Sequence, residues 1–158
     1  NSQPSFVVGD WPSGVTIEIT FNGPLYGRGG ASEEDGGTAL YTRYPITVTN
    51  NSRIAGGGGG GGRGKFLDGP GSWYARGGGG AGYEPGAGLE GSEPGTREAG
   101  GQGLTFSTSI GGDGGDPGMD GTPGNSGADT SGDAGIAVDG ESFVTYAVEG
   151  TIIGPRVN

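Results

Sequence analysis

Cysteine and histidine are both absent from this chain of 158 residues. Without cysteine, disulfide staples and zinc–thiolate sites are excluded, and without histidine the usual catalytic triads and imidazole metal sites are excluded as well. Long apolar runs are also missing, since no segment approaches the roughly 20 residues that a membrane-spanning helix needs. The start of the chain shows no signal-peptide pattern, and Asn1 in place of methionine leads us to expect further sequence upstream. We therefore predict no membrane insertion and no thiol or imidazole chemistry.

Basic residues are scarce, because 8 lysines and arginines stand against 18 aspartates and glutamates, for a formal charge of −10. Such a chain repels phosphate-rich partners, so we expect no binding to nucleic acid. The carboxylates fall in glycine- and proline-rich stretches that do not desolvate them, and no two of them stand out as the acid pair of a glycosidase. We predict that the protein is not an enzyme and that the following side chains are solvated: Glu33, Glu34, Asp35, Glu84, Glu90, Glu93 and Glu98.

Glycine is abundant, with 43 residues beside 10 prolines, and "NNSRIAGGGGGGGRG" (Asn50–Gly64) holds seven glycines in a row. Aperiodic chains of this composition are usually disordered. Against disorder stand 6 tyrosines, 5 phenylalanines and 2 tryptophans, together with short runs in which branched and polar residues alternate. With 29% hydrophobic residues the core must be small. We therefore expect one compact domain in which glycine itself is the building material.

Three stretches align without gaps and end in glycine: "VTIEITFNGPLYG" (Val15–Gly27), "YPITVTNNSRIAG" (Tyr44–Gly56) and "SFVTYAVEGTIIG" (Ser142–Gly154). The second and third copies extend backwards, where "DGGTAL" from Asp35 matches "DAGIAV" from Asp133. Their alternation of apolar and polar residues is typical of half-buried strands. We predict that the copies have equivalent structural roles, each a strand, a turn and a buried anchor, the anchors being Leu25, Ile54 and Ile152.

Between Gly56 and Gly132 the period of the sequence is three. Glycine occupies every third position from 112 to 127 in "GDGGDPGMDGTPGNSG", as a polyproline-II helix with one bare stripe requires. A collagen triple helix is disfavoured, because the regular triplets are few and strands flank them. We expect instead a mainly irregular and β fold: a bundle, or sandwich, of polyproline-II-type polyglycine helices with a few short flanking β-strands and essentially no α-helix.

The run Gly56–Gly62 is expected in the middle of this bundle, since only a segment bare on all sides can be surrounded by others. Gly59→Val should then disrupt folding. Gly86→Val, in an expected loop, should be tolerated.

Glycine runs that alternate with variable loops resemble the glycine-rich tail-fibre adhesins of T-even-type phages. The endings "NNSRIAGGGGGGG" and "AGIAVDGESFVTYAVEGTIIG" are similar to those of glycine-rich C-terminal regions of siphophage tail-tip proteins. The resemblance covers most of the chain, from Val15 to Gly154. It implies a glycine scaffold on the virion, at the distal end of a tail fibre or tail tip, whose loops bind an outer-membrane receptor of the host bacterium. The rest of the fibre or tail tip would be the second partner, although a recognisable fibre-attachment domain is missing from the sequence.

Aromatic residues concentrate in "KFLDGPGSWYAR" (Lys65–Arg76) around a Gly-Pro-Gly turn. Tryptophan, tyrosine and arginine dominate interface hot spots, so this loop has the composition of a binding tip. Alternatively, its rings cover the end of the glycine bundle. Further candidates are "QGLTFSTSI" (Gln102–Ile110) and "YEPGAGLEGSEPGTREA" (Tyr83–Ala99). The predicted receptor-binding residues are Phe66, Leu67, Trp73, Tyr74, Arg76, Tyr83, Leu104 and Phe106.

One stretch, "GGDGGDPGM" (Gly111–Met119), partly matches the calcium-binding nonapeptide of β-rolls. Gly118 stands where that motif has a large apolar residue, and there is one copy instead of a stack. We predict no metal and no cofactor, with calcium near Asp113–Asp120 left as an alternative.

The sequence thus predicts a single receptor-binding domain over residues 1–158. Its parts are an entry segment (1–14), strand and glycine repeats (15–64), glycine-rich segments and loops (65–132) and a C-terminal strand unit (133–158). A porin or transporter is favoured as receptor over lipopolysaccharide, whose phosphate groups the charge of −10 opposes. The alternative function is a structural or ice-binding polyglycine protein with a flat active face. The irregular aromatic loops favour the adhesin.

Overall fold

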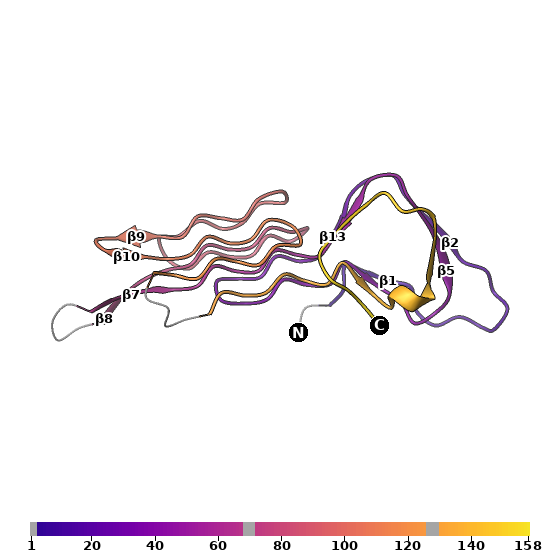
Figure 1. The fold of residues 1–158 in the computed structure, drawn as a ribbon, viewed down its shortest axis with the longest axis horizontal. Helices are drawn as coiled ribbons and strands as arrows, with labels where there is room; N and C mark the ends of the chain where they lie inside the picture. Colours follow the sequence, from indigo (N-terminus) through magenta and orange to yellow (C-terminus); the bar gives the residue numbers. More distant parts are fainter. Residues whose placement is uncertain (1–2, 68–71, 126–129) are drawn as a thin grey trace.

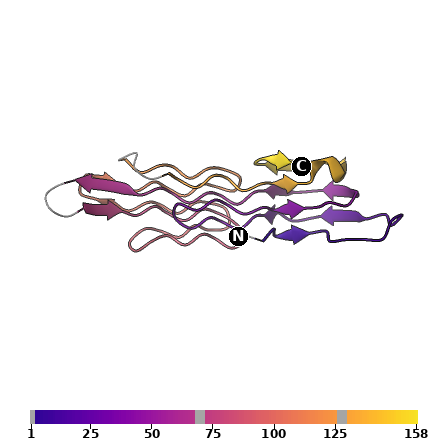
Figure 2. The same cartoon turned by 90° about the horizontal axis from the view of Figure 1, so that it is seen from below.

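The computed structural model describes residues 3–67, 72–125 and 130–158. Figure 1 shows an elongated molecule with two different ends. At one end short strands wind into a triangular coil, and at the other end long segments without regular strands lie side by side (Figures 1 and 2). The described residues contain no α-helix, only the short 3-10 helix η1 (Glu141–Phe143). The predicted mainly irregular and β fold with essentially no α-helix is confirmed.

The triangular coil is a parallel β-helix, in which each turn of the chain lays one strand on each of three faces. Its strands pair in parallel from turn to turn, in the sheet orders β12-β5-β2, β13-β6-β3 and β1-β4-β11-β14. The strands are β1 (Phe6–Val7), β2 (Glu18–Phe21) and β3 (Leu25–Tyr26) in the first turn; β4 (Leu40–Tyr41), β5 (Ile46–Asn50) and β6 (Arg53–Ala55) in the second; and β11 (Val138–Asp139), β12 (Val144–Val148) and β13 (Thr151–Ile153) in the third, followed by β14 (Arg156–Val157).

The register of this coil follows the internal repeat of the sequence. Val48 lies opposite both Ile19 and Tyr146, and Ile54 lies opposite both Leu25 and Ile152. The predicted equivalence of the three copies is therefore confirmed. Ile54 is fully buried, whereas Leu25 and Ile152 are half-buried, because only the middle turn has a neighbouring turn on both sides.

The core of the coil is centred on its middle turn. Leu40, Val48, Ile54 and Val138 are its largest fully buried apolar side chains. Along β5 buried and half-buried residues alternate, which is the period of two that a strand with one apolar face produces. The hydrophobic core of the chain thus lies in this coil. A different interaction must hold together the glycine-rich segments outside it.

Glycine-rich segments leave the coil at one vertex of the triangle (Figure 1). After β3 the chain passes through residues 27–37 before it returns at β4, and after β6 it passes through residues 56–135 before it returns at β11. Gly27 and Gly56 mark the exits, while Gly154, with a φ of 109°, turns the third copy into β14 instead. We call the segments outside the coil the glycine bundle.

Residues 56–62 lie at the centre of the bundle and are all buried. Their backbone N–H groups donate to three neighbouring segments in a repeating order, Gly57 and Gly60 to residues 34–37, Gly58 and Gly61 to residues 78–81, and Gly59 and Gly62 to residues 119–122. Their carbonyl groups accept in the same order from residues 132–135, 30–33 and 112–115. Six segments therefore surround this one, each bonded at every third residue. The expectation that the seven-glycine run lies in the middle is confirmed.

A second segment, residues 76–82, is surrounded in the same way. It exchanges backbone hydrogen bonds with residues 27–33, 56–62, 84–89, 92–96, 99–104 and 110–116. From the sequence, only the longer run was expected in the interior. The four glycines Gly77–Gly80 were the signal that could have identified the second one.

The triplet glycines form two antiparallel segments and not one extended helix. The chain reverses at Gly118, whose φ is 74°, and Thr122 and Asn125 then donate from their backbones to Asp113 and Ile110. The spacing of three continues through the turn, so the sequence pattern hid the reversal.

The expectation that Gly86 tolerates a side chain was wrong. Gly86 is buried and donates to the carbonyl of Gly80, and a Cβ at this position would overlap the carbonyl oxygen of Gly30. Its neighbours Glu84 and Pro85 are exposed and resemble a loop, but every third residue of an outer segment still faces the interior.

Candidate functional site

Two antiparallel hairpins project from the end of the glycine bundle that lies away from the coil (Figure 1). The first joins β7 (Gly64–Leu67) to β8 (Ser72–Ala75), and the second joins β9 (Thr105–Phe106) to β10 (Ser109–Ile110). They occupy the two aromatic stretches for which sequence analysis expected loops. Of the predicted site residues, Phe66, Leu67, Trp73, Tyr74, Arg76, Leu104 and Phe106 belong to these hairpins or directly flank them.

Large apolar side chains are exposed on both hairpins. Tyr74 is 41% exposed, Phe106 55% and Ile110 49%. Leu104 and Arg76 are half-buried, with Leu104 packed beside Gly91. Ile110 was not among the predicted residues, although its place at the end of "TFSTSI" after an alternating run was a usable signal. The side chains of Phe66, Leu67 and Trp73, and the Gly-Pro-Gly turn, lie outside the described residues, so their roles stay predictions.

The two hairpins are connected to one another. Ser109 on β10 is fully buried, and its hydroxyl oxygen accepts a hydrogen bond of 3.2 Å from the backbone N–H of Ala75 on β8. Ala75 is fully buried as well. The two hairpins, with their exposed rings, are therefore held together. We call this pair of hairpins the tip.

Comparison with known families shows what this architecture belongs to. The model of the phage tail fibre adhesin Gp38 family matches residues 1–157. The chain belongs to this family of phage tail fibre adhesins. Among solved structures, the adhesin is similar to a chain in the gp37-gp38 adhesin tip complex of the long tail fibre of bacteriophage S16, with 26% identity and a TM-score of 0.74. That match covers 97% of the adhesin but 64% of the solved chain, so the adhesin spans less than two thirds of it. No curated protein matches the adhesin.

The family assignment decides between the functions that the sequence left open. A tail fibre adhesin is a binding protein of the virion and not an enzyme, and its place is on the tail fibre. The ice-binding alternative is therefore not supported. The described part of the adhesin contains no helix long and apolar enough to cross a membrane.

Tyr83 is separated from the other predicted site residues. It lies at the end of the bundle next to the coil, where its backbone N–H donates to Gly27. Its side chain is half exposed, and its hydroxyl group donates to Glu84 at 3.1 Å. This hydrogen bond, together with the negative charge of Glu84, raises the pKa of Tyr83. Tyr83 cannot share one compact surface with Tyr74 and Phe106.

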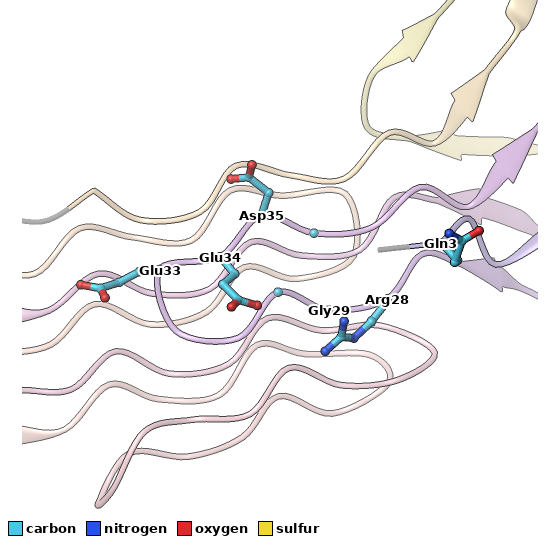
Figure 3. A pocket seen from close by; sticks show the side chains of 8 residues that line it. Gln3, Arg28, Gly29, Glu33, Glu34 and Asp35 are labelled. Carbon is cyan, nitrogen blue, oxygen red and sulfur yellow. The ribbon is translucent and has the colours of Figure 1, made fainter. Parts of the chain in front are cut away.

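A polar groove of about 750 Å³ follows the flank of the bundle (Figure 3). Figure 3 shows its charged side chains spread along the groove instead of converging on one point. Several of these groups already have partners, since Glu33 pairs with Arg63 at 2.8 Å and Arg28 with Glu84 at 3.8 Å. The groove is lined by Gln3, Arg28, Gly29, Gly30, Glu33, Glu34, Asp35 and Gly36.

Carboxylates have a structural use at the edges of the bundle. Asp113 and Asp116 accept hydrogen bonds from the backbone N–H groups of Gly103 and Gly100, at 2.8 and 3.1 Å. Asp120 accepts in the same way from Ala134 at 2.7 Å. Each side chain takes the place of a carbonyl group where two outer segments meet. Across the described ranges no three acidic residues are grouped so that they could hold a metal ion, and the carboxylates of the nonapeptide-like stretch bind the scaffold.

Glu98 also has a structural partner, where sequence analysis expected only solvent. The hydroxyl group of Tyr26, which is 2% exposed, lies 2.9 and 2.8 Å from the two carboxylate oxygens of Glu98 and donates to that carboxylate. Burial and this hydrogen bond raise the pKa of Tyr26. The contact joins a turn of the bundle to strand β3 of the coil.

Proposed function

We propose that this adhesin binds a protein in the outer membrane of the host bacterium through its tip. The observation that carries the proposal is the exposure of three large apolar side chains, Tyr74, Phe106 and Ile110, on hairpins at the free end of the bundle. Exposed aromatic residues on a rigid support are typical of interface hot spots. We propose further that Phe66, Leu67, Trp73, Arg76 and Leu104 contribute to the same surface.

The glycine bundle would serve as the rigid support. We propose that its segments are polyglycine helices of the polyproline-II type, with three residues per turn. The hydrogen bonds that repeat at every third residue of 56–62 support this geometry, as does the absence of positive φ angles from these glycines. An isolated helix of this type has no internal hydrogen bonds, so only a bundle can satisfy its backbone.

The charge of the β9–β10 hairpin supports a protein receptor over lipopolysaccharide. The β7–β8 hairpin and its flank carry Lys65 and Arg76, whereas residues 99–112, which include the β9–β10 hairpin, contain no ionisable side chain. A surface that recognises phosphate groups needs arginine or lysine side chains or a helix N-terminus. The β9–β10 hairpin has hydroxyl and apolar groups and no charge, and it instead fits the extracellular loops of a porin or transporter.

We propose that the whole chain acts as one receptor-binding domain at the distal end of the tail fibre, with its coil directed toward the rest of the fibre. The solved neighbour is a complex of an adhesin with gp37, which supports a fibre protein as the second partner. The position of the tip, at the end of the bundle away from the coil, supports the same orientation.

Binding to defined membranes tests this function. Labelled adhesin is incubated with outer-membrane vesicles from a panel of bacteria, and then with vesicles from single-gene mutants of a binding strain that lack one porin or transporter. Purified lipopolysaccharide is tested in parallel. We expect saturable binding that is lost with one membrane protein and that is unchanged in strains with truncated lipopolysaccharide. Equal binding to every single-protein mutant, together with saturable binding to purified lipopolysaccharide, would contradict the proposal.

A further inference from the structure

One side chain at the tip, Asn125, makes an unusual set of contacts with the β9–β10 hairpin. Its Oδ1 atom accepts from the backbone N–H of Ile110 at 3.0 Å, and its Nδ2 atom donates to the backbone carbonyl of Thr108. Its own backbone N–H donates to the carbonyl of Ile110 at 2.9 Å. A single residue of the neighbouring segment thus holds the edge of the hairpin that does not pair with β9, at three backbone groups.

The hairpin needs such external support. Each strand contains two residues, and two-stranded hairpins are marginally stable in water even when they are longer. The turn between the strands also contains Ser107 at a φ of 56°, a conformation that residues other than glycine adopt only when their surroundings hold them there. The exposed side chains of Phe106 and Ile110 therefore take their position from contacts outside this hairpin.

We infer that Asn125 is a positioning residue of the receptor-binding surface, which fixes the β9–β10 hairpin and with it Phe106 and Ile110. This inference rests on the proposed function of the tip. Asparagine suits the role because one planar side chain offers an acceptor and a donor side by side. Aspartate keeps the acceptor for the N–H of Ile110 but places a negative oxygen against the carbonyl of Thr108, and alanine removes both contacts.

The test compares Asn125→Ala and Asn125→Asp with Asn51→Ala. Asn51 is a matched control, because its side chain also makes a hydrogen bond in an exposed position, to Asn22 at 2.9 Å, but in the coil. We expect both Asn125 variants to bind receptor-containing vesicles about tenfold more weakly, with melting temperatures close to that of the unmodified adhesin. The control should change neither quantity.

Two further measurements separate positioning from other roles. The amide of Ile110 should exchange with solvent faster in Asn125→Ala, whether or not a receptor is present. In a double-mutant cycle, Asn125→Ala should weaken binding much less in a Phe106→Ala background, because Asn125 acts through that ring. Unchanged exchange at Ile110, or a full tenfold loss on top of Phe106→Ala, would overturn the inference. If Phe106→Ala has no effect on binding but exchange at Ile110 does increase, the proposed function of the tip fails while the positioning of the hairpin by Asn125 stands.

Discussion

Alanine in place of Gly59 should unfold the glycine bundle, although it adds a single methyl group. Gly59 lies in the central segment, and a Cβ there would overlap the carbonyl group of Gly132 on the neighbouring segment. The atoms that the methyl group would meet are backbone atoms of Gly132 and Asp133, so no side-chain rotation can relieve the overlap. We expect a loss of about 4 kcal/mol or more in the free energy of unfolding, and a melting temperature lower by about 10 °C or more.

Gly23→Ala is the matched control for this experiment. Gly23 lies in the turn between β2 and β3, has no positive φ, and no atom lies within 4 Å of a Cβ built on it. Its melting temperature, followed by circular dichroism, should stay within about 2 °C of that of the unmodified adhesin. Gly86→Ala should resemble Gly59→Ala and not the control. If Gly59→Ala and Gly23→Ala melt at the same temperature, the glycine bundle does not stabilise the molecule in the way described.

The double variant Phe106→Ala with Ile110→Ala should lose at least about a hundredfold in affinity for the host membrane, since each truncation of a central hot spot costs about 2 kcal/mol or more. Both side chains are about half exposed in the free adhesin, at 55% and 49%. Their removal should therefore leave the melting temperature nearly unchanged.

The matching control truncates two exposed side chains of the coil, Val7 and Val148, which are 50% and 46% exposed. Affinity for vesicles and thermal unfolding are measured on the same preparations of both double variants. Full binding by the tip variant, or an equal loss in the coil variant, would show that the receptor contacts another surface.

The equivalence of the three strand units and their register could be predicted from the sequence, whereas their winding into a parallel β-helix was not predicted. The apolar residues of a parallel β-helix must stack in line through successive turns, so Leu25, Ile54 and Ile152 occur at corresponding places in three copies of one pattern. The central place of Gly56–Gly62 was equally predictable, because only bare backbone can be surrounded by other backbone.

The path of the chain within the bundle could not be predicted. Glycine at every third position is required in interior and outer segments alike, so the pattern shows neither the reversal at Gly118 nor the burial of Gly86. Tyr83 was grouped with the tip for the same reason, since the sequence does not tell at which end of the bundle a turn lies. The contact of Asn125 with Ile110 depends on the meeting of two segments 15 residues apart, which no local pattern records.

Hydrogen exchange at the amides of Gly57–Gly62 tests the central claim most directly, because each of these N–H groups donates to a neighbouring segment. If backbone hydrogen bonds among six neighbours make the rigid support of the tip, these amides should exchange only through global unfolding, with protection equal to the full stability of the adhesin. Exchange of Gly57–Gly62 near the rate of an unstructured chain, while the core residues Val48 and Ile54 stay protected, would contradict the account.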